Sequence, residues 1–191
     1  METPLDDGRP LHAHAIMACV EGNTARLREL LRVLQPSDIG ELLECNSWPD
    51  ETTLLKVACG QGHLDVAKCL IGCGADPDDA GDDPEDGVEA DSSRKAPIHL
   101  AAQCGHADLV RWLVCEGGAE ARKCDRNGCN AYHLGCVQGH NDVVHFLVEE
   151  ADLDVNEPDG AGGTGLGWAV KQGHAELAQW LREQGAVDTL P

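Results

Sequence analysis

The chain has 191 residues, of which 42% are hydrophobic, and this is enough for one domain with a continuous core. Lys and Arg number 14 against 34 Asp and Glu, which gives a formal net charge of −20. Such a charge repels nucleic acid and anionic lipid, so we expect no nucleic-acid partner and favour a basic protein surface instead. No apolar run approaches the length of a membrane span, and we expect no membrane insertion.

The first ten residues, METPLDDGRP, predict no targeting segment. They are acidic and have neither the apolar core of a secretion signal nor the Arg-rich pattern of an organelle presequence. Ten cysteines in such a chain fit a reducing compartment, where a thiol serves as a small buried hydrophobe. We therefore expect a cytoplasmic location, with the nucleus as the alternative.

The first predicted unit covers about residues 9–36, and an insertion at about 37–49 follows it. The unit has two stretches of helical spacing, LHAHAIMACV and TARLRELLRVL, around the turn residues Gly22 and Asn23. These two stretches predict a helix-turn-helix unit.

The first insertion is expected to hold one short helix. Ser37 would cap this helix, which runs to about Cys45, and Pro49 would end the segment. Trp48 lies in the loop that follows. Its ring has two interpretations, one as a plug packed against the first two units and one as an exposed anchor for a partner.

The dipeptide Gly-His defines a repeat in the rest of the chain. Gly139 follows Gly105 by 34 residues and Gly173 follows Gly139 by 34, whereas Gly105 follows Gly62 by 43. The surplus falls in an insertion at about 77–95, where a loop absorbs it. A pattern of helical spacing follows each Gly-His, and a shorter helical segment precedes it.

The second insertion is strongly acidic. From Asp76 to Asp91 it carries nine acids and no base. Such a segment buries too little apolar area to order itself, so we expect a mobile loop. A docking element for a partner with a basic patch facing residues 76–91 is an alternative. A calcium loop is a third, although the D-x-[DN]-x-[DN]-G spacing is absent.

The segment APIHLAAQCGHADLVRWLVCEGGAE resembles the ankyrin repeat, whose pattern is TPLHxAA…GH…VVxxLLxxGAD, and four such segments match across residues 50–191. The first unit is interpreted as a degenerate capping repeat, because an end repeat has solvent on one side. The resemblance implies an all-α ankyrin-repeat solenoid of about five helix-turn-helix units with hairpin-like fingers. We expect a single domain with repeats at about 9–36, 50–76, 92–121, 125–156 and 159–187.

Helix starts are predicted at the same position of each repeat. Thr53, Asn130 and Thr164 would each cap a first helix through a side-chain oxygen. Ala96 lacks such an oxygen, so its repeat would depend on Pro97 at the first helical position.

Cysteine and histidine are abundant, yet we expect no metal site and no cofactor. No C-x-x-C pair occurs, and equivalent histidines of successive repeats would lie about 10 Å apart, too far to share an ion. Cys59 and Cys136 fall on a small-residue core position. Cys124 and Cys129 flank a predicted finger, either as a reversible disulfide or as two unrelated thiols. One position of the second helix is interpreted as facing inward, and it is occupied by Cys69, Trp112, Phe146 and Trp180.

No catalytic pattern is found, and we expect neither an enzyme nor a small-molecule substrate. A nucleophile elbow is absent, and no Lys-Ser/Thr follows the glycine run at 160–167. Gly165 and Gly167 stand where the family usually has Pro and His. Each is expected to weaken the last repeat by about 0.5–1 kcal/mol, and Trp168 to compensate by burying a large surface.

The resemblance also implies a function, since family members usually bind a protein on the concave side formed by first helices and finger tips. We expect a non-catalytic protein-interaction module; the alternative is an accessory structural subunit of a large multiprotein assembly. Carried onto matching positions, the concave side selects Gly60, Gln61, Gln103, Cys104, Val137, Gln138, Lys171 and Gln172, and the fingers add the basic spot Arg122, Lys123, Arg126 and Asn127.

Overall fold

The computed structural model describes residues 10–43, 52–80 and 94–190, and these contain eleven helices and no strand. The expectations for Cys45, Trp48 and Pro49 lie outside the described residues, as does most of the second insertion. The helices are α1 (Leu11–Val20), α2 (Thr24–Val33), α3 (Pro36–Leu43), α4 (Leu54–Gln61), α5 (Leu64–Gly72), α6 (Pro97–Gln103), α7 (Ala107–Cys115), α8 (Ala131–Gln138), α9 (Asn141–Glu149), α10 (Gly165–Gln172) and α11 (Ala175–Glu183).

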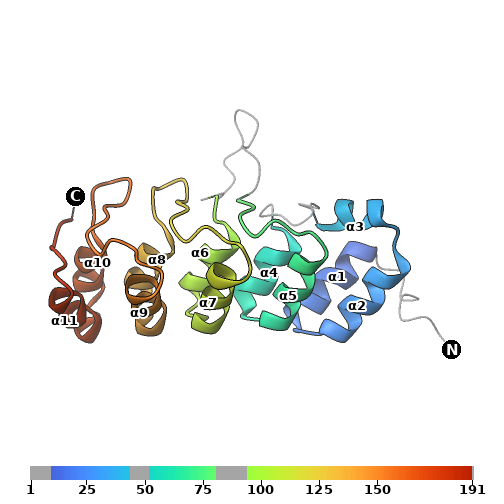
Figure 1. Ribbon diagram of the computed structural model, residues 1–191, viewed down its shortest axis with the longest axis horizontal. Helices are drawn as coiled ribbons and strands as arrows, with labels where there is room; N and C mark the ends of the chain where they lie inside the picture. The colour runs from blue at the N-terminus through green and yellow to red at the C-terminus, as the bar shows by residue number, and fades with distance from the viewer. Residues whose placement is uncertain (1–9, 44–51, 81–93, 191) are drawn as a thin grey trace.

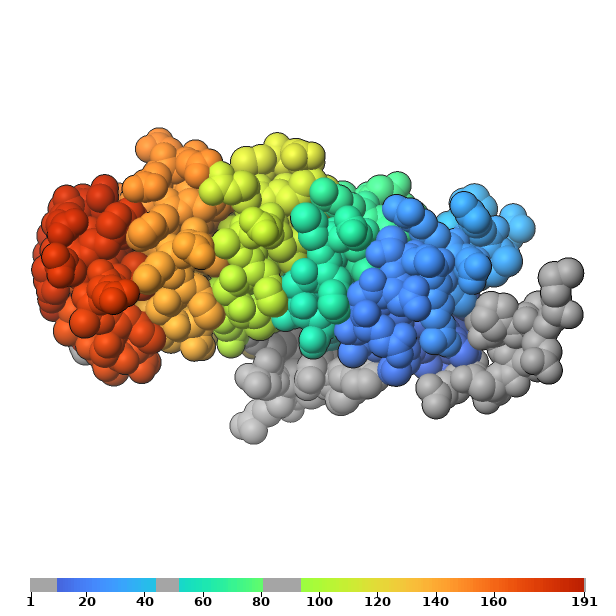
Figure 2. All heavy atoms as spheres, turned by 90° about the horizontal axis from the view of Figure 1, so that it is seen from below, coloured from blue at the N-terminus to red at the C-terminus, as the bar shows by residue number. Residues whose placement is uncertain are grey.

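Pairs of antiparallel helices are stacked in chain order along one axis (Figure 1). The first helices of successive pairs contact one another, α1 with α4, α4 with α6, α6 with α8 and α8 with α10. In Figure 2 the pairs form successive bands, from blue to red, along one elongated body. The connections after α7 and α9 rise as fingers on one side of the stack (Figure 1). The predicted all-α solenoid is confirmed.

The helices are short and depend on their neighbours for stability. Helices of 7 to 10 residues are marginal in water, so each pair must bury its apolar stripe against the next pair. Leu55 and Leu70 are at most 2% exposed, and the predicted core thiols Cys59 and Cys136 are fully buried. Burial raises the pKa of the Cys59 thiol to about 12, so this thiol behaves as a small hydrophobe.

The predicted helix caps are confirmed in the repeats. The side-chain oxygens of Thr53, Asn130 and Thr164 accept from backbone N–H groups three residues later at 3.5, 3.2 and 3.4 Å. At Ala96 the first helical residue is Pro97, as predicted. Nδ1 of His99 also accepts from the Ala96 N–H at 3.0 Å, so a side chain inside the helix satisfies this backbone donor.

The predicted cap of the extra helix is wrong by two residues. Helix α3 begins at Pro36, and Ser37 lies inside its first turn. The fixed φ of proline suits the first helical position, so the helix starts there without a serine cap. The Ser37 hydroxyl instead donates to Oδ1 of Asp38 at 3.1 Å.

One glycine-histidine contact recurs at the junctions between repeats. The glycine that ends a first helix is left-handed, with φ of 75° at Gly139. A Cβ added there would lie 2.5 Å from Nδ1 of His174, so only glycine leaves room for the ring. The Nε2 of each such histidine donates to a carbonyl of the preceding repeat: His63 to Val20 (3.0 Å), His106 to Gly60 (3.1 Å), His140 to Gln103 (3.0 Å) and His174 to Val137 (2.9 Å).

The aromatic position of the second helices does not face fully inward, which corrects the sequence interpretation. Phe146 is 2% exposed, but Cys69, Trp112 and Trp180 are half-buried. The three rings lie where two repeats meet, and each contacts a side chain of the preceding repeat; Phe146 is also part of the buried core, whereas Trp112 and Trp180 are not fully buried. We call these three contacts the outer ladder: Lys68 Nζ lies 5.6 Å from the Trp112 ring centroid, the Arg111 guanidinium 4.6 Å from that of Phe146, and the His145 ring 4.0 Å from that of Trp180.

The two glycines of α10 have a packing role that the sequence did not indicate. A Cβ at Gly165 would collide with the phenol of Tyr132, and one at Gly167 with the backbone of Thr189. The two glycines lower the helix propensity of α10, as expected, but they also permit these close contacts, which a larger residue would prevent.

Replacing Gly139 by alanine is expected to destabilise the stack. The new Cβ would meet the His174 ring and would also require a left-handed alanine, for a combined cost of about 2–5 kcal/mol. Urea unfolding followed by circular dichroism measures this loss. As the control, Gly40→Ala in α3 adds a Cβ with nothing within 4 Å, and should be neutral or stabilising by about 0.5–1 kcal/mol. Equal losses in both variants would contradict the junction described here.

The outer ladder is expected to couple neighbouring repeats. A double-mutant cycle of Arg111→Ala and Phe146→Leu should give a coupling of about 0.5–1 kcal/mol in the free energy of unfolding. The same cycle with Lys68→Ala and Trp112→Leu should give less, because the ammonium lies 5.6 Å from the ring instead of 4.6 Å. Arg111 also pairs with Glu150, so the cycle is measured in a Glu150→Gln background. No coupling for Arg111 and Phe146 would show that the contact adds nothing.

Candidate protein-binding surface

The first helices present one set of solvent-facing side chains per repeat. Counting back from the glycine that ends each first helix, the residues one, two and five positions earlier are half-buried or exposed in every repeat. We call this set the first-helix surface. Because the glycine-histidine junction is repeated, equivalent residues line up along the stack. The positions five residues earlier are all apolar, and they are Met17, Val57, Leu100, Leu134 and Trp168.

The sequence-predicted concave residues all belong to this surface. Gln61, Cys104, Gln138 and Gln172 occupy the position next to the glycine and are exposed. At the position before these, Lys171 is exposed. Gly60, Gln103 and Val137 are half-buried at the same position, and their carbonyls accept from the junction histidines. Sequence reasoning missed the apolar column, although its residues recur in the same register. Helical spacing alone does not show whether an apolar residue faces the core or the solvent.

Trp168, which was expected to compensate for the glycines by burying a large surface, is partly buried. It is half-buried and lies in the apolar column of the first-helix surface. Its indole N–H donates to Oδ2 of Asp159 at 2.7 Å, and Lys171 Nζ lies 4.5 Å from its ring. The Trp168 ring therefore contacts an acidic side chain, Asp159, through its indole N–H and a basic side chain, Lys171, through its face.

The two last fingers are built on the same carboxylate turn. Oδ1 of Asp125 accepts from the N–H groups of Asn127 and Cys129 at 2.8 and 2.9 Å. Oδ1 of Asp159, 34 residues later, accepts from Ala161 and Gly163 at 2.9 Å each. These turns hold the finger tips rigid, since a carboxylate with two N–H donors fixes the loop around it.

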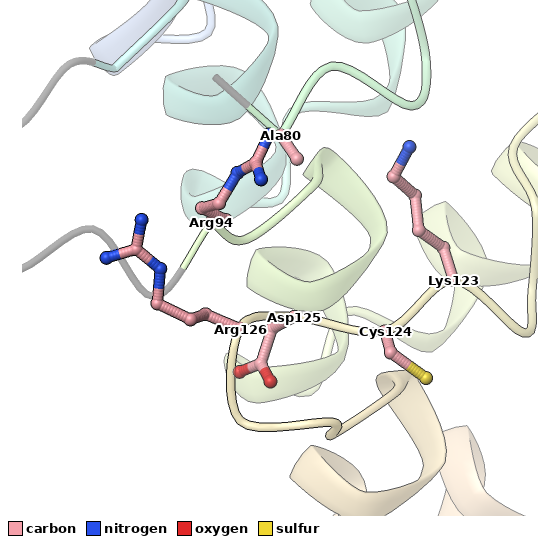
Figure 3. Close-up of a pocket in the computed structure, with 6 residues that line it drawn as sticks. All are labelled: Ala80, Arg94, Lys123, Cys124, Asp125 and Arg126. Atoms are coloured by element: carbon pink, nitrogen blue, oxygen red, sulfur yellow. The ribbon is translucent and has the colours of Figure 1, made fainter. Parts of the chain in front are cut away.

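The four residues of the predicted basic spot fall into two groups, because only two of them join neighbouring fingers. Arg122 reaches the next finger, where its guanidinium donates to the Asp152 carbonyl at 2.6 Å. The Asn127 carbonyl accepts from Gly160 N–H at 3.0 Å, which also joins neighbouring fingers. Arg122 and Asn127 therefore stabilise the finger stack, while Lys123 and Arg126 extend from the same loop and line a hollow beside it (Figure 3).

A hollow of about 280 Å³ lies at the finger tips (Figure 3). Lys123 and Arg126 point to the same side of their loop as Arg94, which comes from the start of the third repeat. The Asp125 carboxylate turns the other way, into its own loop. Sequence reasoning missed Arg94, because it assigned that residue to the acidic insertion. We call this site the basic hollow, and its lining residues are Ala80, Arg94, Lys123, Cys124, Asp125 and Arg126.

The two thiols beside this finger are both free in the structure. Cys124 is exposed and its thiol donates to the Arg122 carbonyl at 3.5 Å, while Cys129 is half-buried. Burial, reinforced by the neighbouring Asp125, raises the pKa of Cys129 to about 12. A thiol with such a pKa is protonated at neutral pH and is a poor nucleophile for disulfide exchange.

Two other kinds of site are not found in the described part of the chain. Residues 10–43, 52–80 and 94–190 contain no group of three or more His, Cys, Asp or Glu side chains arranged to hold a metal ion. Among these same residues, no helix combines the length and the apolarity needed to cross a membrane.

Comparison with known proteins places the chain in a family. The model for ankyrin repeats in three copies matches residues 15–122, 81–159 and 98–189. These matches cover most of the chain and agree with the stacked helix pairs and the fingers. The chain belongs to the ankyrin-repeat family.

Two curated proteins are similar in sequence to part of this chain. Ankyrin repeat domain-containing protein 63 from Homo sapiens is 36% identical over 62 residues, and the protein of that name from Mus musculus is 34% identical over 62 residues. Each match covers 32% of this chain, and 14% and 13% of the two relatives. The shared region is thus a small part of those longer proteins.

The Asp159 turn predicts a pH dependence of stability. Burial opposes ionisation of this carboxyl, but donors from Gly163, Trp168 and Ala161 outweigh it and lower its pKa. A lowered folded-state pKa stabilises the protein above the unfolded value of about 3.9, and this contribution is lost as the pH falls through the folded value.

At neutral pH the wild type should therefore be more stable than Asp159→Asn, and the difference should shrink as the pH falls from about 5 to 2. Urea unfolding at stepped pH measures this difference. Asp188→Asn, which changes an exposed carboxyl near the chain end, should leave the pH profile parallel to that of the wild type. A constant difference between wild type and Asp159→Asn would contradict the role given to this turn.

Proposed function

We propose that this chain is a non-catalytic module that binds a protein through the first-helix surface and the finger tips. The observation that carries the proposal is the apolar column from Met17 to Trp168, which the structure leaves half-buried or exposed in each repeat. Apolar side chains aligned along one surface gain free energy when a partner covers them. Flanking glutamines offer donors and acceptors that orient such a partner.

The contrast with the opposite side of the stack supports this choice of surface. On the second helices, charged and aromatic side chains are engaged with one another in the outer ladder and in the Arg111–Glu150 pair. Along the first helices, the column residues have no such cross-repeat partners among the interactions described. We also propose a cytoplasmic location, because the nine described cysteines are free thiols.

Site-specific photo-crosslinking tests the proposal. A photo-reactive benzoylphenylalanine replaces Gln138 on the first-helix surface or, as a matched control, the exposed Gln179 on the second helix of the last repeat. In native extract, we expect a crosslinked protein from position 138 and not from position 179. Leu134→Glu, beside position 138 in the apolar column, should remove the crosslink while circular dichroism shows an intact fold. Crosslinks from position 179 alone would contradict the proposal.

Size exclusion of the same extract separates a transient partner from a permanent assembly. A module that binds transiently should elute partly alone, whereas an accessory structural subunit should elute only with the large complex.

A further inference from the structure

The first-helix surface carries little charge, although the chain as a whole is strongly charged. Its three positions in each of the five units give fifteen residues. Charged residues make up 25% of the chain, so about four would be expected among these fifteen. Only Glu21 and Lys171 are charged, and both are exposed. The acids that give the chain its net charge of −20 therefore lie outside this surface.

The middle of the surface combines apolar and uncharged polar side chains. Next to the glycine, the three middle units carry Gln61, Cys104 and Gln138. One base borders this region, but Lys95 is half-buried and its Nζ donates to Oε1 of Gln103 at 2.8 Å. A partner's charged side chain placed over this region would lose hydration without gaining an opposite charge. The middle therefore favours a partner segment that is itself uncharged.

The two charges lie at opposite ends of the surface. Glu21 belongs to the first unit and Lys171 to the last, and the first helices α1, α4, α6, α8 and α10 contact one another in this order. Packed helices lie about 8–10 Å apart, so these four steps separate the two charges by roughly 40 Å. This is several times the screening length of about 8 Å at physiological salt. Each charge therefore acts on its own end of a bound partner.

The charge at the last repeat is held over an aromatic ring. Nζ of Lys171 lies 4.5 Å from the centroid of Trp168, whose indole N–H is bound by Asp159. That carboxylate also accepts from two backbone N–H groups of its own turn, so it is already engaged by three donors. Among the residues that the structure describes, no carboxylate forms a salt bridge with Lys171 and no base forms one with Glu21. Both charges can therefore meet an opposite charge of a partner.

We propose that the first-helix surface binds an uncharged, mainly apolar segment of the protein partner, which has a basic residue at the end that meets Glu21 and an acidic residue at the end that meets Lys171. The proposal rests on the protein-binding function proposed above, and it specifies the chemistry and direction of the partner. The apolar middle supplies affinity, and the end charges set orientation and register. This partner differs from the basic one expected from net charge, because the acids behind that charge lie elsewhere.

Three labelled peptides test the proposal, with binding to the whole chain measured by fluorescence anisotropy at about 0.15 M salt. All share a centre of four evenly spaced leucines among eight serines, which spans about 40 Å when extended. The first peptide has two lysines at one end and two glutamates at the other, the second has lysines at both ends, and the third has glutamates at both ends. The wild type should bind the first most tightly, by about two- to fivefold, which is the factor that an exposed ion pair supplies.

Reversing one charge of the surface should change which peptide binds best. Lys171→Glu leaves an acid at each end and should favour the lysine-ended peptide, whereas Glu21→Lys leaves a base at each end and should favour the glutamate-ended peptide. Lys171→Gln should remove the preference at its end without reversing it. As matched controls, Arg182→Glu on α11 and Glu29→Lys on α2 make the same charge changes at exposed positions outside the surface, and should keep the wild-type order. Circular dichroism confirms that each variant is folded.

Three results would overturn the proposal. They are the absence of binding by all three peptides, an order of affinities that neither charge reversal changes, and an order that the control variants change as much. The crosslinking experiment separates these failures from failure of the proposed function. A crosslink from position 138 together with any of the three results would reject the proposed segment alone, and loss of the crosslink as well would reject the first-helix surface as a binding site.

Discussion

The contact between a left-handed glycine and the histidine ring of the next repeat sets the spacing of the stack. A helix end leaves carbonyls without intrahelical partners, and each junction histidine donates to such a carbonyl of the preceding repeat. The missing Cβ of the glycine lets the ring approach closely enough to do so. One dipeptide therefore ends a helix, satisfies its backbone and positions the following pair. Because the contact recurs, residues in the same register lie in columns along the stack.

The two long sides of the stack use their side chains differently. On the second helices, bases and rings of successive repeats are stacked on each other, so that charge and aromatic surface contribute to cohesion. On the first helices, the side chains of the apolar column have no charge–ring or ring–ring contact across repeats among the interactions described, and they are half-buried or exposed. At the finger tips, Arg122 and Asn127 serve cohesion while Lys123 and Arg126 face the hollow.

Much of the architecture follows from the sequence, because it is encoded locally. The Gly-His period predicts the helix pairs, and Thr53, Asn130 and Thr164 cap their helices as side-chain chemistry requires. What the sequence did not reveal depends on neighbours across repeats. Phe146 and Trp112 share one register, but only the structure shows the first buried and the second half-buried.

The same reason explains the residues that were missed in the candidate site. The apolar column from Met17 to Trp168 has the helical spacing of a core, and only the packing of first helices against each other shows that it faces outward. By sequence Arg94 belongs to the acidic insertion, but in the structure it lines the same hollow as the finger residues Lys123 and Arg126. Neither composition nor periodicity carries that information, because both describe a segment without its surroundings.

The close fit of Tyr132 against Gly165 has a consequence for how this chain can change. Tyr132 is fully buried, and its hydroxyl donates to the Val155 carbonyl at 2.9 Å. The ring has room there only because the first helix of the next repeat begins with glycine, Gly165. In the preceding repeat, the position of Tyr132 holds Ile98. A shuffled chain that placed the last repeat directly after Ile98 would leave a void, and one that placed another repeat after Tyr132 would bring a side chain into its ring. The repeats share a pattern but are not interchangeable modules.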